Sequence, residues 1–465
     1  MNRRRLESLL RHRAARDPLT RQIRDAAREI EAEAWLVGGY VRDSALGQPA
    51  SDVDLIAGRG ALRLVGALRR RWETRGFRFR KRGVTTWRFG IAGRDVDLVD
   101  ASRRGLERDL RRRDFTINAI AFDLGHSRLS DPLCGLADLR AKRLRLPRPG
   151  VIGEDPLRAL RAARFLAQLP EFDLDRAARV GVAAAARGLR RASRERVGTE
   201  LNKLLAATAP RRGLEALYRL GLLDSVLPEL IALPDCVAGA ERPDVWRHTL
   251  DAIDESGRTG RLPGAAAGRD GDGRRLLRWA LLLHDIAKPE TFVVREDGRP
   301  TFHGHEVIGA HRADALLERL RLPRDDRRRV GRLILNHLRP SLLAESGAPS
   351  RGMRRLVREA GDDLPLLLLH AACDALASGS PDATRRWRRL RRVLIELLEL
   401  WQARRRLTLP RLVSGNDVMR TLGLPPGPRV GELLTQISDL QEDGSLITRK
   451  DALAWLKELS FLTSR

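Results

Sequence analysis

The chain has few cysteines and no long apolar run, and each of these shortages excludes a class of protein. Only three cysteines occur among 465 residues, far apart at Cys134, Cys236 and Cys373, so neither a disulfide framework nor a cysteine-rich zinc site is indicated. No stretch approaches the roughly 18 to 20 continuous apolar residues of a membrane span, and the arginine-rich N-terminus lacks the apolar core of a secretory signal. We therefore expect a cytoplasmic protein with reduced thiols and no membrane partner.

Basic residues are abundant, but almost all of them are arginine. The 88 Lys and Arg residues outnumber the 61 Asp and Glu residues, which gives a formal net charge of +27. A strongly basic chain favours a polyanionic partner such as nucleic acid, with affinity that falls steeply with salt. Only six of the basic residues are lysines, however, and genome base composition explains such a skew equally well. Charge alone therefore leaves the partner undecided.

Length and residue pattern predict an α+β chain of several domains. With 465 residues, 42% of them hydrophobic, the chain can bury about two to four cores. A basic helix is predicted over residues 1–34, followed by short apolar strands and helical segments. From about Glu154 onward Ala, Leu and Arg recur at helical spacing almost to the end, interrupted by a Gly-rich segment, 256–275, that predicts a loop. A mixed head should thus precede a helical body.

Two carboxylates lie two residues apart at Asp52 and Asp54, directly after Ser51. On a predicted strand both would project from one face and bind the same pair of divalent ions. One ion would lower the pKa of an attacking 3′-hydroxyl, and the other would neutralise the triphosphate and the departing pyrophosphate. In isolation, alternating acids on an edge strand are more often structural.

The neighbouring segments strengthen the catalytic interpretation. Gly38 and Gly39 follow an apolar strand, where they let backbone N–H groups approach a triphosphate and where Arg42 could add charge, although a plain tight turn has the same appearance. Further along, Asp95 and Asp97 alternate onto one face of another strand, and we favour Asp97 as a third carboxylate. A strand, a Gly-Gly turn and Asp-x-Asp together resemble the polymerase-β nucleotidyltransferase superfamily.

A further block narrows the resemblance to the class II tRNA nucleotidyltransferase and bacterial poly(A) polymerase family. RRDFTINA, residues 112–119, is similar to the ribose-recognition motif of that family. The resemblance implies that Asp114 accepts a hydrogen bond from the 2′-hydroxyl and selects ribonucleotides, with Arg113 and Asn118 in the same nucleotide site. A basic helix start capped by Asp114 is the structural alternative.

The segment EDPLR, residues 154–158, combines an acceptor and a planar donor. Pro156 marks a first helical turn, so Asp155 and Arg158 should share one face. Arg158 can donate to ring and carbonyl acceptors while Asp155 accepts from an exocyclic amine, as in C or A. An ion pair at a helix start is the alternative. By resemblance the pair is the family's amino-acid template, with Glu154 orienting Arg158 and Arg161 completing the nucleotide site.

Histidines and aspartates recur along the helical body. Imidazole and carboxylate donors on successive helices suit transition metals or Mg²⁺, and a bound ion would activate water for attack on phosphorus, although a single buried His is usually a core residue. The order His, His-Asp, His, His, Asp resembles the HD phosphohydrolase family. That resemblance assigns one metal to His248, His284, Asp285 and Asp374, and a second metal or the scissile phosphate to His305 and His337.

Two later segments extend the resemblance. Residues 193–205 are similar to the last head-and-neck motif of the family, with a structural role for Glu195 and Arg196. Residues 414–459 resemble the tail that follows the HD domain in bacterial CCA-adding enzymes. Contact with tRNA and simple helix packing are equally open for that tail.

The resemblance covers nearly the whole chain and implies a polymerase-β-like head with a mixed sheet, followed by an all-α body that includes an HD domain. The expected divisions are a nucleotidyltransferase head over 1–130, a helical neck with the nucleobase motif over 131–225, an HD phosphohydrolase-like domain over 226–380 and a tRNA-contacting region over 381–465.

The implied function is addition of C, CC or CCA to the tRNA 3′ end from CTP and ATP, with Mg²⁺ in the head and Mg²⁺, Mn²⁺, Ni²⁺ or Co²⁺ in the HD site. About fifteen residues separate Asp97 from Arg113, where CCA-adding relatives carry a longer loop, which favours the CC-adding subgroup. The alternatives are a poly(A) polymerase and an HD phosphohydrolase with a vestigial RNA-binding head. The sequence leaves the oligomeric state open.

Overall fold

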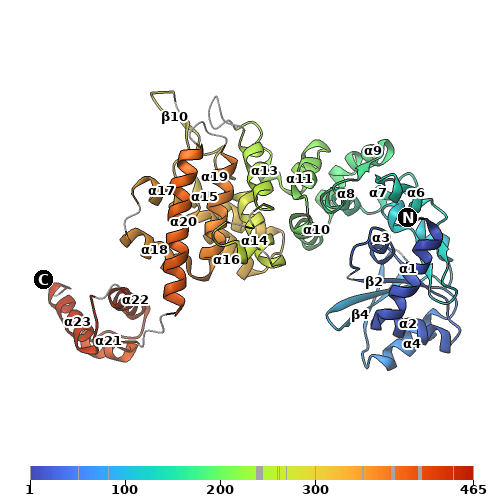
Figure 1. Cartoon of the computed structure of the whole chain (residues 1–465), viewed down its shortest axis with the longest axis horizontal. Coiled ribbons are helices and arrows are strands. Elements are labelled where there is room, and N and C mark those ends of the chain that lie inside the picture. Colours follow the sequence, from blue (N-terminus) through green and yellow to red (C-terminus); the bar gives the residue numbers. More distant parts are fainter. Residues whose placement is uncertain are drawn as a thin grey trace. The chain divides into compact units, whose positions relative to one another are not determined.

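The computed structural model describes residues 2–50, 52–81, 83–236, 244–258, 260, 262–268, 270–298, 300–347, 350–378, 383–406, 411–442 and 445–463. Figure 1 shows the order of the elements, from strands and helices at the N-terminus to helices almost alone in the rest of the chain. The predicted α+β class, with a mixed head before a helical body, is confirmed.

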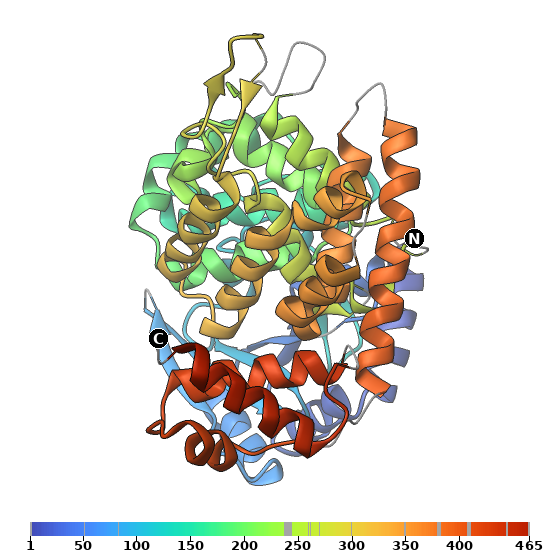
Figure 2. The same ribbon diagram turned by 90° about the vertical axis from the view of Figure 1, so that its left-hand side faces the viewer.

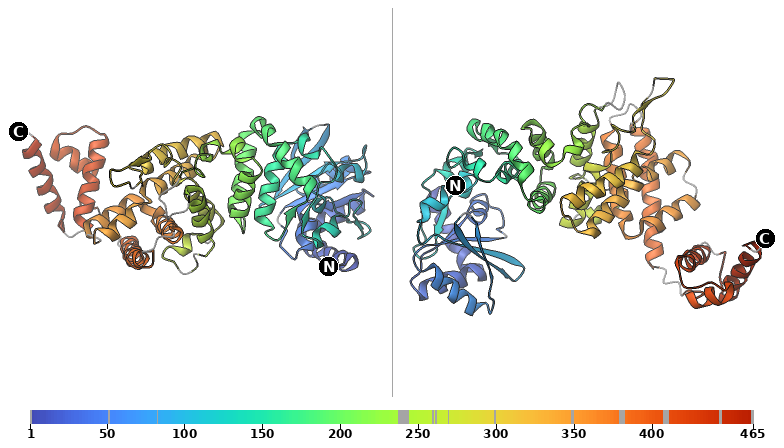
Figure 3. Two further views of the ribbon diagram at one scale, coloured as in Figure 1. Left: turned by 90° about the horizontal axis from the view of Figure 1, so that it is seen from above. Right: turned by 180° about the vertical axis from the view of Figure 1, so that it is seen from behind.

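Seven strands form one mixed sheet in the head, in the order β3-β4-β5-β2-β1-β6-β7. Their bounds are β1 (Ala34–Val37), β2 (Val53–Ala57), β3 (Phe77–Lys81), β4 (Val84–Ile91), β5 (Arg94–Asp100), β6 (Ala121–Asp123) and β7 (Leu129–Ser130). β2 and β5 run parallel, whereas the other neighbouring pairs are antiparallel. Leu36, Leu55 and Leu98 are fully buried at matching positions of three adjacent strands, so the core runs across the sheet. Figure 3 shows these strands gathered in the blue and cyan part of the chain.

Helices surround this sheet, and the first of them departs from the sequence prediction. The head contains α1 (Arg3–Arg16), α2 (Pro18–Glu29), α3 (Gly39–Ala45), α4 (Ala61–Arg71) and α5 (Leu106–Leu110). The single basic helix expected over 1–34 is wrong, because the chain breaks at Asp17. Pro18 cannot donate a backbone hydrogen bond to continue α1, and the Asp17 side chain accepts from the backbone N–H of Leu19 to start α2.

The neck is built around one central helix. Its elements are η1 (Thr116–Asn118), α6 (Gly135–Arg140), β8 (Arg143–Leu144), α7 (Val151–Glu154), α8 (Leu157–Gln168), β9 (Asp173–Leu174), α9 (Arg176–Ala184), η2 (Ala186–Arg191), α10 (Arg194–Ala206), α11 (Pro210–Arg219), α12 (Leu223–Val226) and η3 (Pro228–Leu230). α8 contacts both α10 and α11. A Cβ at Gly213 would lie 2.8 Å from the Ala163 carbonyl oxygen, so α11 reaches α8 only because that residue is glycine.

The HD body packs around two apolar helices. Its elements are α13 (Val245–Glu255), η5 (Ala265–Gly268), α14 (Gly271–Leu283), β10 (Val293–Val294), β11 (Pro300–Thr301), α15 (His305–Arg319), α16 (Arg324–Asn336), α17 (Arg339–Glu345), α18 (Ser350–Ala360), η6 (Gly361–Asp363), α19 (Leu364–Ala377) and α20 (Ala383–Arg406). α19 is buried along most of its length, as expected of a helix that is apolar on nearly all sides, and it contacts α14, which is buried over residues 276–283. Figure 2 shows α20, in orange, at one side of this group of helices.

The Gly-rich segment 256–275 is only partly a loop. Residues 259, 261 and 269 lie outside the described part of the chain, but η5 and the start of α14 fall within the segment. Asp270 begins α14 by accepting a hydrogen bond from the backbone N–H of Gly273. This cap explains why helix starts before the apolar pattern does.

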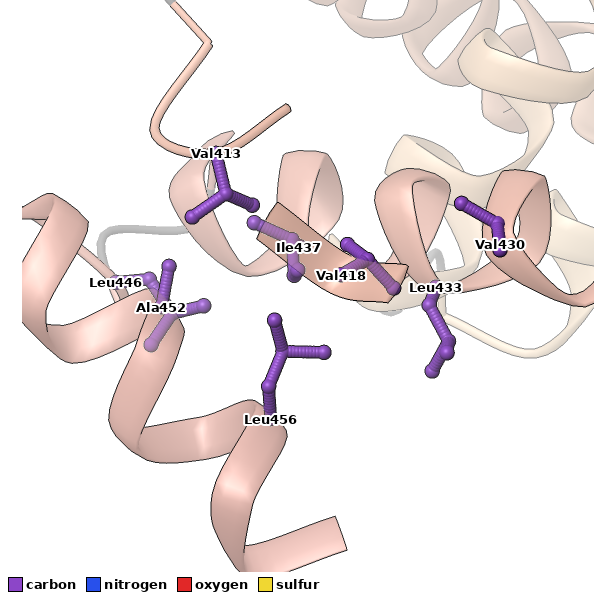
Figure 4. Packing of buried hydrophobic residues seen from close by; sticks show 8 residues of the cluster. All are labelled: Val413, Val418, Val430, Leu433, Ile437, Leu446, Ala452 and Leu456. Carbon is purple, nitrogen blue, oxygen red and sulfur yellow. The ribbon is translucent and has the colours of Figure 1, made fainter. Parts of the chain in front are cut away.

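The chain divides into two compact units, Met1–Leu398 and Glu399–Arg465. The second unit contains α21 (Gly415–Leu422), α22 (Pro428–Glu442) and α23 (Arg449–Thr463). Figure 4 shows its own small core, made by Val413, Val418, Val430, Leu433, Ile437, Leu446, Ala452 and Leu456. Among the described helices of the whole chain, none has the length and apolar character needed to cross a membrane.

Candidate active sites

Two carboxylates of the head meet through the pairing of parallel strands. Asp54 on β2 lies directly opposite Asp97 on β5, and on its other side it faces Val37, the last residue of β1. Gly38 follows with φ +68°, and a Cβ there would lie 2.4 Å from Oδ2 of Asp54. Gly38 is therefore required both for its backbone conformation and for the space it leaves. Gly39 begins α3 and has room for a side chain, with its nearest neighbours 3.6 Å away.

The sequence predicts Asp52 on the same strand as Asp54, but Asp52 lies outside that strand. β2 begins at Val53, and Asp52 lies exposed in the bend before it, while Ser51 falls outside the described residues. Burial raises the pKa of Asp54, and repulsion from Asp97 and Asp52 adds to the rise, although 42% of the Asp54 side-chain surface stays accessible. Arg113, 3.7 Å from Oδ2 of Asp54, opposes this shift. The three acids are thus close enough to repel one another.

Asp97 is held by a guanidinium in a two-point contact. Nε and Nη2 of Arg88 donate to the two Asp97 oxygens at 2.7 and 2.6 Å. Asp95 lies 3.9 Å from Arg88, with 55% of its side chain exposed, and pairs across the sheet with Gly90 rather than with a residue of β2. Asp97 is therefore the acid that the sheet brings to Asp54. Mutually repelling carboxylate oxygens are the donor set that Mg²⁺ prefers, so these residues fit a divalent cation.

Asp114 is the centre of a buried polar network. Its Oδ1 accepts from the backbone N–H of Phe115 at 2.9 Å and from Nδ2 of Asn118 at 2.8 Å, while Nη2 of Arg161 lies 2.8 Å from its Oδ2. Burial alone would raise the pKa of Asp114, but Arg161 and these donors lower it to about 2. Arg42 extends the network by donating from Nη1 to Oδ1 of Asn118 at 2.8 Å. The motif residues Arg42, Asp114, Asn118 and Arg161 thus form one connected unit, with Asp114 only 4% exposed.

The base-recognition candidates lie where α7 meets α8. Asp155 has an extended backbone, φ −142°, and precedes the helix that begins at Leu157, so it is not part of the helix that carries Arg158, although the backbone N–H of Arg158 donates to the Asp155 carbonyl at 2.9 Å. Pro156 produces this break, because the residue before a proline is kept from helical conformation. Arg158 donates from Nη1 to the Val151 carbonyl at 2.6 Å and from Nη2 to the Arg112 carbonyl.

Glu154 and Arg196 brace this pair from two sides. Oε2 of Glu154 lies 3.5 Å from Nη1 of Arg158, and its Oε1 accepts from Arg148. This arrangement supports the orienting role that the sequence suggests for Glu154. Arg196, interpreted from sequence as structural, donates from Nη2 to Oδ2 of Asp155 at 2.9 Å. No sequence spacing links Arg196 to Asp155, because α10 brings them together only in the folded neck.

Four histidines of the HD body use their ring nitrogens in the same way. Nδ1 of each lies within hydrogen-bonding distance of a backbone carbonyl oxygen, which leaves Nε2 toward the centre. The distances are 3.4 Å for His248, 2.8 Å for His284, 2.7 Å for His305 and 2.6 Å for His337. Such an arrangement fixes the tautomer that offers Nε2 to a metal.

The Nε2 atoms converge on Asp285. His248, His284 and Asp285 form one group that could hold an ion, and Asp285, His305 and His337 form another. Nε2 of His284 lies 3.1 Å from Oδ2 of Asp285, and Nε2 of His305 lies 3.5 Å from Oδ1. Asp285 could therefore bridge two ions.

Asp374 completes the first of these groups. Its Oδ1 lies 2.8 Å from Nε2 of His248 and 3.6 Å from Nε2 of His284. The structure thus brings together all six residues that the sequence assigns to this site.

Electrostatics show that the HD centre suits a cation. Nε2 of His284 and Oδ1 of Asp285 are buried without a hydrogen-bond partner among the described residues. Burial works against a charged His284, yet Asp285 and Asp374 raise its pKa to about 10, whereas burial and the neighbouring His284 lower that of His337 to about 4. A proton on His284 takes the place that a metal ion would fill, so the donor set fits a divalent ion.

Two further residues belong to this centre. Lys288 donates from Nζ to Oδ2 of Asp285 at 2.7 Å, three residues along the chain. His370 is fully buried, with ring centroids 5.3 and 5.6 Å from those of His284 and His337. Its position four residues before Asp374, one helical turn, is the signal that could have identified it from sequence.

Three models of known protein families match parts of this chain. The Poly A polymerase head domain model matches residues 34–145, a model for a probable RNA- and SrmB-binding site of polymerase A matches 171–233, and the HD domain model matches 253–378. These ranges contain the Asp54–Asp97 pair and most of the HD centre described above. The protein is an RNA nucleotidyltransferase with an HD domain.

Relatives and solved structures define the family. The chain is 37% identical over 444 residues to an A-adding tRNA nucleotidyltransferase of Deinococcus radiodurans, a match that covers 91% of this chain and 95% of the relative. It is 33% identical to a CC-adding tRNA nucleotidyltransferase of Thermus thermophilus, with 91% and 93% covered. The chain therefore belongs to the tRNA nucleotidyltransferase family. The Thermotoga maritima CCA-adding enzyme complexed with tRNA shares its fold, with a TM-score of 0.60 at 18% identity over 97% of each chain.

Proposed function

We propose that the head transfers a nucleotide from a nucleoside triphosphate to the 3′-hydroxyl of tRNA, with Asp52, Asp54 and Asp97 as the metal-binding acids. The register pairing of Asp54 with Asp97, next to a glycine that cannot be replaced, is the observation that carries this proposal. With Mg²⁺ bound there, the 3′-hydroxyl is more easily deprotonated and the triphosphate charge is balanced. Arg88 must release Asp97 for this to occur, because it engages both oxygens.

The chain's own residues then position the nucleotide. Arg113 beside Gly38 and Arg42 beside Gly39 add positive charge where triphosphate oxygens would lie. Asp114 holds Arg161 and Asn118 in place and offers its carboxylate to a ribose 2′-hydroxyl. Asp155 and Arg158 present an acceptor and a donor to the base, which suits C and A because both carry an exocyclic amine.

Of the possible reactions, we favour addition of the terminal A to tRNA. Across 91% of the chain the identity is 37% to the A-adding relative and 33% to the CC-adding one. Addition of CC is the second candidate, supported by the short connection in which only α5 separates β5 from Arg113.

The HD centre would hydrolyse phosphate esters. His248, His284, Asp285 and Asp374 would hold one divalent ion and His305 and His337 a second, with Mg²⁺, Mn²⁺, Ni²⁺ and Co²⁺ as candidates. The chemistry that such an ion supplies there is activation of water for attack on phosphorus. Lys288 would hold Asp285 in place and offer charge to the phosphate.

One experiment separates the products. Full-length protein is incubated with tRNA transcripts that end before the first C, after CC and after CCA, and each nucleoside triphosphate is offered separately. Extension of the CC-ending transcript by a single A, with the shorter transcript left unchanged, is expected. Extension of the shorter transcript by CC alone would establish the second candidate, and long A tails on arbitrary RNA would contradict both.

A further inference from the structure

A pocket of about 570 Å³ opens at the HD centre. His248, Lys288 and Asp374 line it, so it leads directly to the atoms that converge on Asp285. Its volume lies within the range of about 300 to 1,000 Å³ typical of sites for small molecules. Residues of the first turns of α20 line the same pocket, in agreement with the course of that helix in Figure 2.

α20 brings unusual charge to this pocket. Arg385, Arg386 and Arg389 line it, all three are exposed, and none forms an ion pair with a carboxylate of the described residues. The first turn of α20 contains no acidic residue, although acids are the favoured residues at that end of a helix. Three unpaired guanidinium groups in a concave site raise the local concentration of anions. The acids Glu345 and Asp374 are also in the wall, and Asp374 already contacts His248.

One phosphate group does not require so much charge. A phosphate monoester carries about two negative charges at neutral pH, which bound cations and Lys288 would balance at the HD centre. The arginines of α20 remain for further phosphate groups, because guanidinium groups bind phosphate oxygens in pairs. Trp387, half-buried in the same wall, offers an aromatic surface on which a nucleobase can stack.

We propose that this pocket binds nucleotides that carry at least two consecutive phosphates, with the terminal phosphate at the HD centre and the others on Arg385, Arg386 and Arg389. This inference rests on the proposed hydrolytic function of that centre and names its substrate class. The limited volume of about 570 Å³, with three guanidinium groups and Trp387 in its wall, favours a free nucleotide over the backbone of a long RNA.

Residue-resolved arginine labelling tests the binding without any need for turnover. Full-length protein with Mg²⁺ is treated with phenylglyoxal in the presence of adenosine 5′-(α,β-methylene)diphosphate, and the labelled arginines are located by fragmentation mass spectrometry. Labelling of Arg385, Arg386 and Arg389 should slow at least about fivefold, whereas Arg388 and Arg392, exposed on the same helix but outside the pocket, should label as before. Nucleotide in the head cannot mimic this pattern.

Three ligand arms distinguish the alternatives. Adenosine monophosphate should protect far less than the diphosphate analogue, and equal protection would overturn the requirement for two phosphates. Inorganic pyrophosphate should protect more weakly than the nucleotide, and equal protection would remove the role given to Trp387. Protection by tRNA without protection by the nucleotide would overturn the proposal in favour of an RNA surface.

A matched pair of double variants tests the same point by affinity. Inhibition of p-nitrophenyl phosphate hydrolysis by the diphosphate analogue should weaken at least about tenfold in Arg385→Ala, Arg389→Ala, since each charged contact is worth about 1.5 kcal/mol or more. The control Arg388→Ala, Arg392→Ala removes the same charge at the same spacing and should stay within about twofold of wild type. If no divalent metal supports hydrolysis, the proposed HD activity fails, while the labelling result still decides whether the pocket binds nucleotides.

Discussion

Removing Arg196 should relax base selection without touching either the metal site or the base-pairing atoms. Arg196 donates to Oδ2 of Asp155 at 2.9 Å, and Asp155 has no helix to hold it because its backbone is extended before Pro156. In Arg196→Ala the carboxylate should sample other rotamers, so its contact with an exocyclic amine is formed less often. The acids of the head that we propose to bind metal lie on other elements and should be unaffected.

The exposure of the Arg196 side chain sets the expected loss of base discrimination. A correct bidentate contact with a base is worth about 1 to 3 kcal/mol, which corresponds to about 5- to 150-fold in discrimination. Arg196 has 44% of its side chain exposed, so solvent screens the ion pair and its positioning effect should be near the lower limit. We expect a loss of about fivefold in discrimination against U and G for Arg196→Ala, and a larger loss for Asp155→Ala or Arg158→Ala.

Single-turnover extension of tRNA with each of the four nucleoside triphosphates gives the discrimination ratios directly. Arg194→Ala is the matched control, because Arg194 lies one half-turn away on α10 and forms no ion pair with a described residue. Unchanged discrimination ratios in Arg196→Ala, with strongly altered ratios in Asp155→Ala, would show that Asp155 keeps its position without Arg196. Unchanged ratios in both would refute the amino-acid template itself.

Three further outcomes are expected. Asp114→Asn should lower the free energy of unfolding by about 2 kcal/mol at pH 7, because the pKa of Asp114 falls from 3.8 to about 2 on folding. That contribution is complete above pH 5 and is lost as the pH falls from about 4 to 2, so urea midpoints of variant and wild type should converge at pH 2 if the network is as described. Gly38→Ala should cost about 1 to 3 kcal/mol and abolish nucleotide addition, since its φ is +68° and its Cβ would meet Asp54, whereas Gly39→Ala should fold like the wild type by thermal denaturation. Asp285→Ala should eliminate metal-dependent hydrolysis of phosphomonoesters or 2′,3′-cyclic phosphates and spare nucleotide addition, and loss of both activities in a folded variant would mean that the two sites are coupled.

The sequence predicted elements whose cause is local. The strands that carry Asp54 and Asp97 follow from alternating apolar residues, and the helices of the body follow from Leu and Ala at helical spacing. The break at Asp17 was missed because a cap followed by proline was not weighed against the continuous basic pattern. β3, Phe77–Lys81, was missed although phenylalanine and arginine alternate in it, because it is short and basic, none of residues 77–80 is buried, and the strand is held by its pairing with β4.

Residue contacts across elements could not be predicted. The pairing of Arg88 with Asp97 depends on the register between β4 and β5, and that of Arg196 with Asp155 on the packing of α10 against the neck. Arg385 and Arg389 reach the HD centre only through the fold of α20 beside it. The position of Asp285 in both candidate ion-binding groups also required coordinates, since sequence order gives the donors without assigning them to one group or two.

We propose that Asp54 is an acid of the nucleotidyl-transfer site rather than part of a vestigial head. The most direct measurement is extension of two tRNA transcripts, one ending before the first C and one ending in CC, with ATP and with CTP, by wild type and by Asp54→Ala under saturating Mg²⁺, alongside tRNA binding by gel shift. We expect wild type to add a nucleotide and Asp54→Ala to add none while it still binds tRNA, because the proposed role of this carboxylate is to bind metal and it should contribute little to RNA affinity. Near-normal addition by Asp54→Ala would contradict the assignment of the head.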